Sequence, residues 1–107
     1  MVPIYDLNDV HAAARQLRIE YRGRKVMRDV ANLGYELEDV ADCLSKLSEA
    51  EFSKSHFRQA APDDDEYICR YPRPDSHDGE TDRLYVKFCL IDNYLVVDLG
   101  SFHLTQY

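Results

Sequence analysis

Side chains suited to phosphodiester chemistry gather in the second half of the chain. They are Lys54, His56, Arg70, Arg73, Tyr85 and Lys87. Cleavage of RNA needs a base for the ribose 2′-hydroxyl proton, a cation for the charged phosphorane and an acid for the leaving 5′-oxygen. It needs no metal, because the 2′-hydroxyl already lies beside the phosphorus. Lysine and arginine suit the developing charge, and tyrosine or histidine can move the protons.

Each of these residues also has a structural interpretation, because no fixed spacing marks such a site. Lys54 can be a cation at the C-terminal end of a helix, and Tyr85 can be a cross-strand packing partner. Arg70 and Arg73 can pair with nearby acidic segments. From the residue types alone, both interpretations stay open.

A predicted β-hairpin over residues 83–99 positions two of these side chains. Apolar residues alternate with Tyr85 and Lys87, which is the pattern of a strand with one buried face. Asp92-Asn93 tolerates the positive φ of a tight turn, and the return strand is predicted to begin at Tyr94. If the apolar residues face the core, Tyr85 and Lys87 project together from the other face.

The first half of the chain is predicted to be helical. The predicted helices span residues 7–20, 24–32 and 36–47. Asp6 is placed to cap the first helix, Gly23 separates the first two, and Gly34 suits the end of the second. Ser48 to Glu51 forms a capping box that starts one more short turn, after which Lys54 is expected to face the same groove as Tyr85.

Shorter elements complete the expected fold. We expect a loop over residues 60–66, a strand over residues 67–71, a polar connection over residues 75–82, and an edge strand or docked tail over residues 101–107. Helices followed by strands predict one α+β domain, residues 1–107, with the helices packed on one face of a small antiparallel sheet.

The charge pattern leaves room for an anionic partner even though the net charge is −7. Most of the acidity of the second half lies in residues 63–66 and 75–82, which we interpret as solvated, mobile connections. The predicted first two helices carry a basic set, a candidate patch for phosphates or an acidic partner. It comprises Arg15, Arg18, Arg22, Arg24, Lys25 and Arg28.

Several classes of protein are not indicated by the sequence. The residues that follow Met1 resemble no secretory signal, and no apolar run reaches the roughly 20 residues of a membrane span. The cysteines form no CxxC pair and the histidines are scattered, so we expect neither a metal site nor a cofactor. An odd number of cysteines suits reduced thiols in the cytoplasm.

Three motifs resemble those of the MqsR family of toxins. They are Leu-Ser-Glu-Ala-Glu-Phe-Ser-Lys-Ser at 47–55, Tyr-Pro-Arg-Pro at 71–74 and Leu-Tyr-Val-Lys at 84–87. Upstream, Leu-Gly-Tyr-Glu-Leu at 33–37 resembles a family segment without gaps. The similarity covers most of the chain, and the order of the motifs is the family's order.

The resemblance implies a ribosome-independent mRNA interferase, the toxin of a type II toxin–antitoxin pair, with a RelE- or YoeB-like fold. It implies that Lys54 is the active-site lysine and Tyr85 the strand tyrosine, with metal-independent cleavage of single-stranded mRNA. Catalytic candidates are thus Lys54, Tyr85, Arg70 and His56, and RNA-binding candidates are Lys87, Arg73, Arg22, Arg24 and Lys25. The implied partner is a cognate antitoxin, through which operator DNA is contacted only indirectly.

The chain departs from the family at two positions. The strand before the Arg-Pro stretch offers Ile68, Cys69 and Arg70 in place of a glutamine, and a lysine near the family's C-terminus falls near Gly100. His103 and Arg70 are candidates for the two roles. The alternative function is a non-catalytic module that binds the antitoxin and regulates an operon, and a third is an acidic mimic of nucleic acid that docks through residues 63–66.

Overall fold

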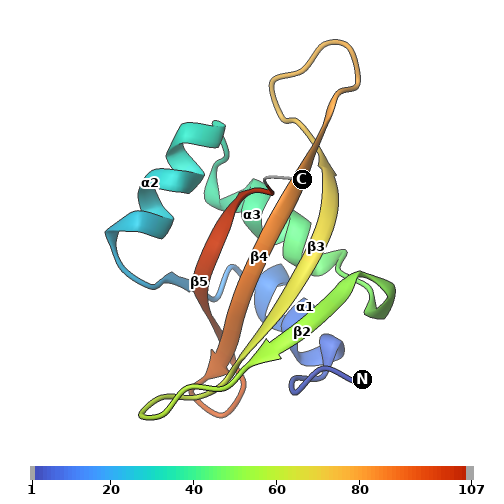
Figure 1. The fold of residues 1–107 in the computed structure, drawn as a ribbon. Helices are drawn as coiled ribbons and strands as arrows, with labels where there is room; N and C mark the ends of the chain where they lie inside the picture. Colours follow the sequence, from blue (N-terminus) through green and yellow to red (C-terminus); the bar gives the residue numbers. More distant parts are fainter. Residues whose placement is uncertain (1, 106–107) are drawn as a thin grey trace.

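The computed structural model describes residues 2–105 and contains helices followed by a sheet (Figure 1). The elements are α1 (Leu7–Arg15), β1 (Ile19–Tyr21), α2 (Arg24–Leu33), α3 (Leu37–Ser45), a 3₁₀ turn (Glu49–Glu51), β2 (Phe52–His56), β3 (Asp64–Pro72), β4 (Thr81–Ile91) and β5 (Val96–Leu104). Among the described residues, no helix is both long and apolar enough to cross a membrane.

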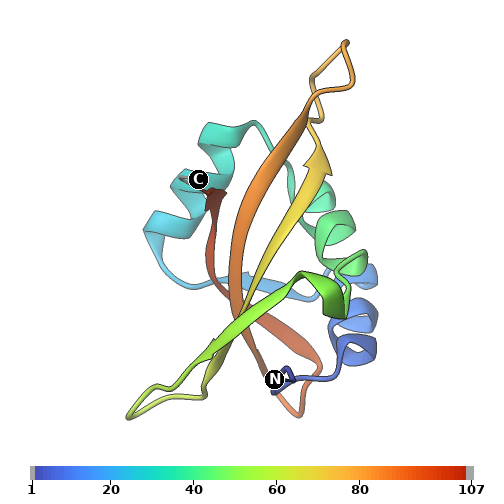
Figure 2. The same cartoon turned by 45° about the vertical axis from the view of Figure 1, so that its right-hand side comes forward.

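The sheet has the strand order β1-β5-β4-β3-β2, and α1 and α3 lie behind it (Figures 1 and 2). Helix α2 runs beside β5, at one side of the sheet. The α+β class is confirmed. The sheet is mixed, however, because β1 pairs with β5 in parallel while the other pairs are antiparallel.

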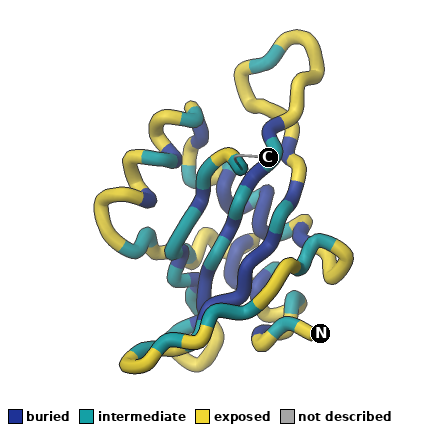
Figure 3. Tube along the Cα trace, in the orientation of Figure 1, coloured by how far each residue is buried: buried dark blue, intermediate teal, exposed yellow. Residues whose placement is uncertain are grey.

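The core lies between the sheet and the helices, and it confirms the predicted register of the hairpin. Leu84, Val86 and Phe88 on β4 are fully buried. Tyr85 and Lys87, which alternate with them, are only half-buried on the opposite face. In Figure 3 the central strands alternate between buried and half-buried positions, whereas the loop after β3 is mostly exposed. The face opposite the helices therefore carries the polar side chains.

The first predicted helix is shorter than expected, because its last residues form a strand instead. Asp6 caps α1 as predicted, its side chain accepting a hydrogen bond from the backbone N–H of Asn8. The helix then ends at Arg15, and Leu17 has a φ of 58°. Residues 19–21 pair with β5, since Ile19 and Tyr21 pack against the core from there. A three-residue strand with a distant partner leaves no local pattern to detect.

The acidic segment 63–66 is not a solvated loop, and this prediction is wrong. Strand β3 begins at Asp64, and Asp64, Asp65 and Glu66 are all buried. Each carboxylate has donors that offset its burial. Asp65, for example, accepts hydrogen bonds from the backbone N–H groups of Ile4 and Tyr5. These acids are therefore parts of the folded sheet.

The C-terminal stretch forms the end of strand β5, which continues to Leu104. Strand β5 lies between β1 and β4, but β1 pairs only with residues 97–99, so residues 101–104 pair with β4 alone and form an edge, as predicted. The strand begins at Val96 instead of Tyr94, because Asp92, Asn93 and Tyr94 all have positive φ in a longer turn. Residues 106–107 of the predicted tail lie outside the described residues.

Candidate active site

The open face of the sheet carries its polar side chains in rows, because directly paired residues of neighbouring strands project to the same side. One row consists of Ile68, Tyr85 and His103; the next consists of Lys54, Glu66, Lys87 and Ser101. Strand pairing thus brings together residues far apart in the sequence. The alternation that buries the hairpin's apolar side chains also aims Tyr85 at this face.

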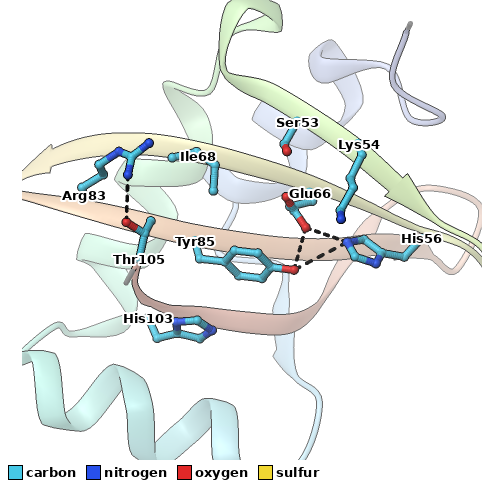
Figure 4. Close-up of a pocket in the computed structure, with 9 residues that line it drawn as sticks. All are labelled: Ser53, Lys54, His56, Glu66, Ile68, Arg83, Tyr85, His103 and Thr105. Atoms are coloured by element: carbon cyan, nitrogen blue, oxygen red, sulfur yellow. Dashed lines mark hydrogen bonds and ion pairs between the residues drawn. The ribbon is translucent and has the colours of Figure 1, made fainter. Parts of the chain in front are cut away.

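A cleft of about 460 Å³ lies over these rows (Figure 4). Its lining residues are Ser53, Lys54, His56, Glu66, Ile68, Arg83, Tyr85, His103 and Thr105. They come from β2, β3 and β4, from β5, and from the residue that follows β5. Three of the four catalytic candidates, Lys54, His56 and Tyr85, therefore share one cleft.

Glu66 is the centre of the hydrogen bonding in the cleft. Its Oε1 accepts a hydrogen bond of 2.7 Å from the Tyr85 hydroxyl and lies 2.7 Å from Nε2 of His56. Because a carboxylate only accepts, that histidine nitrogen carries hydrogen. Burial raises the pKa of Glu66, but hydrogen bonds from Tyr85, Ser53 and His56 outweigh it and hold the pKa below its usual range. Glu66 is thus an ionised carboxylate at neutral pH.

Tyr85 is held as a protonated phenol between two partners. Burial, and then its hydrogen bond to Glu66, raise the pKa of Tyr85 well above that of a free tyrosine. Its hydroxyl also lies 3.5 Å from Nε2 of His56. Its ring stacks on His103, with the ring centroids 5.0 Å apart and the planes 9° from parallel. Tyr85 therefore acts near pH 7 as a hydrogen-bond donor and a flat surface.

Lys54 supplies a positive charge to the cleft. It lies on the edge strand β2, next to a bulge, and not at the end of a helix as its structural interpretation assumed. Figure 4 shows its amino group on the same side as His56 and Glu66. The side chain is exposed, and no ion pair or hydrogen bond to it occurs among the described residues. A cation held without a partner at a cleft suits an anionic ligand.

Arg70 and Lys87 lie on the open face next to the cleft. Arg70 lines a second hollow of about 480 Å³ that shares Ser53, Ile68 and Arg83 with the first. It pairs across the strands with Arg83, whose Nη1 donates to Oγ1 of Thr105. Lys87 stands in the row of Glu66 but is not one of the cleft's lining residues. Both are near enough to extend the site along a ligand.

The other RNA-binding candidates lie apart from the cleft, and three of them have acidic partners. Arg22 binds Asp64 through two nitrogens, at 2.9 and 2.8 Å. Arg73 pairs with Glu80 and Asp82, Lys25 pairs with Asp29, and Arg24 is exposed at the start of α2. The structure therefore does not bring these four to Lys54.

Sequence reasoning missed Glu66, because it assigned that residue to a loop. The signal that could have found it is the alternation of Glu66, Ile68 and Arg70 with buried aromatic and thiol side chains, which extends the strand towards its N-terminus. Among residues 2–105, no three His, Cys, Asp or Glu side chains are grouped in a way that could hold a metal ion.

Comparison with known proteins gives one family. The family model described as "Motility quorum-sensing regulator, toxin of MqsA" matches residues 2–103 of the chain. The match ends at His103, within β5, and includes every other helix and strand in full. A search of curated proteins found no match.

Proposed function

Since the chain belongs to the MqsR family, toxins of toxin–antitoxin systems, we propose that it is an endoribonuclease. It cleaves single-stranded mRNA without a ribosome, and so inhibits translation and growth. Its partner is the cognate antitoxin, and the family description names MqsA as the partner of that family's toxin. We propose that it acts in the cytoplasm, because its proposed substrate is found there.

One observation carries the proposal: an unpaired lysine shares a cleft with a hydrogen-bonded tyrosine, glutamate and histidine. The cation and the proton-bearing groups are the parts that phosphodiester cleavage requires. They converge from separate strands on one side of the sheet, where the cleft is open to solvent. Lys54 and Lys87 leave positive charge on this face in a chain whose net charge is −7. The site therefore attracts phosphate even though the whole protein is acidic.

The proposed reaction is attack of the ribose 2′-oxygen on the adjacent phosphorus. Lys54 stabilises the extra negative charge of the phosphorane. The Tyr85 hydroxyl stays donated to Glu66, and its ring forms a flat surface beside the reacting groups. His56, kept in place by Glu66, is the proton donor for the leaving 5′-oxygen. The products are a 2′,3′-cyclic phosphate and a 5′-hydroxyl. Glu66 acts as a positioning residue, because a carboxylate that already accepts three hydrogen bonds is a poor base.

The test is to incubate the purified protein with a defined mRNA, without ribosomes and in EDTA. We expect discrete fragments whose 3′ ends carry a cyclic phosphate, and no fragments with Lys54→Ala at equal concentration. A ribonuclease of known activity on the same RNA shows that the substrate can be cut. Intact RNA beside that positive control would contradict the proposal.

The alternative, a non-catalytic module that binds the antitoxin, is favoured by one observation at Gly100. A side chain cannot be added there without movement, because its Cβ would lie 2.6 Å from Nη1 of Arg22. The guanidinium that fills the position of the family's lysine is neutralised by Asp64 and Asp98. Induced expression separates the two functions, since a binding module leaves growth unchanged and a ribonuclease arrests it.

A further inference from the structure

We propose that Nε2 of His103 is the base that removes the 2′-hydroxyl proton of the RNA. This inference rests on the ribonuclease function proposed above and assigns the step for which the other cleft residues are unsuited. Glu66 is held as a fully hydrogen-bonded carboxylate, and Tyr85 keeps its own proton at neutral pH. His56 is assigned above to the acid, with its Nε2 held by Glu66. The base is therefore another group at the cleft.

Hydrogen bonding of His103 leaves a lone pair on the required nitrogen. Nδ1 of His103 lies 2.8 Å from the backbone oxygen of Leu104. A carbonyl oxygen only accepts hydrogen bonds, so Nδ1 carries the hydrogen and Nε2 of the neutral ring is an acceptor. The structure shows no partner for Nε2 within residues 2–105. The neighbouring backbone therefore selects the tautomer that a base needs.

Stacking holds the ring in place beside the reacting groups. The imidazole lies nearly parallel to the Tyr85 ring, at 5.0 Å between centroids, and lines the cleft. It is half-buried on β5, where its backbone pairs with that of Tyr85 on β4. A fixed ring close to the substrate reduces the entropy lost in reaching the transition state.

The two histidines lie on opposite sides of Tyr85. His103 stands on β5 and His56 on β2, and the Tyr85 ring and hydroxyl lie between them (Figure 4). In-line displacement at phosphorus needs the base on the side of the attacking oxygen and the acid on the side of the leaving oxygen. A phosphate over Tyr85, with Lys54 beside it, meets this condition.

Several charged or titratable groups surround His103. From β4 it faces Tyr85 and Arg83, and from α2 it faces Asp29, which is paired with Lys25. Glu66, His56 and Lys54 lie across the cleft.

The proposed step balances without another reactant. The 2′-oxygen gives its proton to Nε2 of His103 and forms a bond to phosphorus, while the bond from phosphorus to the 5′-oxygen breaks. That oxygen takes the Nδ1 proton of a His56 imidazolium, whose Nε2 stays hydrogen-bonded to Glu66. His103 ends the step as imidazolium and His56 as neutral imidazole, and exchange with solvent restores both. The net reaction is a transesterification that consumes no water.

The test uses two variants that separate proton transfer from packing. His103→Phe keeps a ring on Tyr85 but has no nitrogen, and His103→Asn keeps a short donor for the Leu104 carbonyl but lacks Nε2. We expect both to lower the cleavage rate by about 100-fold or more and to remove the acid limb of the pH–rate profile. Free imidazole should restore part of the activity of His103→Ala. His77→Ala, in the exposed loop after β3, is the matched control and keeps the parent rate.

These experiments distinguish a wrong assignment of His103 from a wrong assignment of the ribonuclease function. If the parent protein does not cut RNA, the proposed function is wrong. If the parent cuts RNA and His103→Phe cuts it equally, with the same pH profile, His103 is not the base. Circular dichroism and antitoxin binding show whether each variant is folded. A folded His103→Asn that lost its activity and yet kept the acid limb would also overturn the assignment.

Discussion

The open face of the sheet has two polar regions that differ in how their charges are balanced. In one, Arg22 binds Asp64 and Asp98, and Cys89 lies 3.4 Å from the same guanidinium. In the other, Lys54 shares a cleft with Glu66 and has no ion-pair partner among the described residues. The two regions use acids two residues apart on β3, so the same strand serves both.

The difference separates structural polarity from functional polarity. Around Arg22 the charges satisfy one another, and the cluster joins the residue after β1 to β3 and β5. In the cleft the acid is satisfied by neutral or proton-bearing groups, so the lysine charge remains available to a ligand. We therefore expect substitutions in the first region to change stability, and those in the second to change activity.

The largest expected effect is on stability, at Arg22. Arg22→Met leaves Asp64, which is 2% exposed, buried with a charge that its more distant neighbour Arg58 balances only weakly. We expect a loss of about 3 to 5 kcal/mol in the free energy of unfolding, measured by urea denaturation. Arg24→Met, at the exposed start of α2, should change it by less than about 0.5 kcal/mol. If Arg22→Met were as stable as the parent, the charge cluster around Arg22 would not be the stabilising region that the comparison requires.

The matching prediction for the cleft concerns Lys54. Lys54→Ala removes the cation from the phosphorane, which costs on the order of 3 kcal/mol, or roughly 100-fold in the rate of RNA cleavage. Its stability should stay within about 0.5 kcal/mol of the parent, and it should still bind the antitoxin, because the side chain is exposed. Lys46→Ala, on the far side of the sheet, is the control for loss of a lysine. A variant at position 54 that cuts RNA and arrests growth like the parent would place the site elsewhere.

Tyr85→Phe tests a smaller contribution within the same cleft. The variant keeps the ring that stacks on His103 and loses the hydroxyl that donates to Glu66. One lost hydrogen bond to a charged group predicts about a 10-fold lower rate, with substrate binding nearly unchanged. Tyr85→Ala should lower both the cleavage rate and the affinity for substrate, since it also removes the stacking surface. If Tyr85→Phe matched the parent in single-turnover assays, the role of Tyr85 would be stacking alone.

The smallest expected effect is the pH dependence contributed by Glu66. Its pKa is lower in the folded protein, so its ionised form contributes stability above the ordinary glutamate pKa of about 4.3, and this contribution is lost as the pH falls through the lowered value. Glu66→Gln should thus be less stable than the parent at pH 7 and approach it towards pH 3. Unfolding curves measured across that range give the difference directly. If the difference in the free energy of unfolding between Glu66→Gln and the parent did not change with pH, Glu66 would not be held as a carboxylate.

Local sequence patterns predicted the parts of the fold that depend on neighbours in the chain. The alternation around Tyr85 gave the strand register, and Asp6 and Gly34 marked helix ends where the structure has them. Lys54 and Tyr85 were both placed in the site through the resemblance, and the fold brings them to one cleft.

What could not be predicted depends on pairing between distant residues. Strand β1 has only three residues and gains its stability from β5, more than 70 residues later. The buried state of Glu66 depends on donors from β2 and β4, and an acidic run without visible partners resembles a loop. Arg22 looked like part of a basic patch because its acids lie far away in the sequence.

The central place of β5 has a consequence for how the protein is made. A chain emerges from the ribosome N-terminus first, so β1 and β4 are both synthesised before the strand that joins them. Until β5 has emerged, β1 has no partner strand and the cleft lacks the His103 ring. The ribonuclease activity proposed above therefore becomes possible only after β5 is made, close to the end of translation.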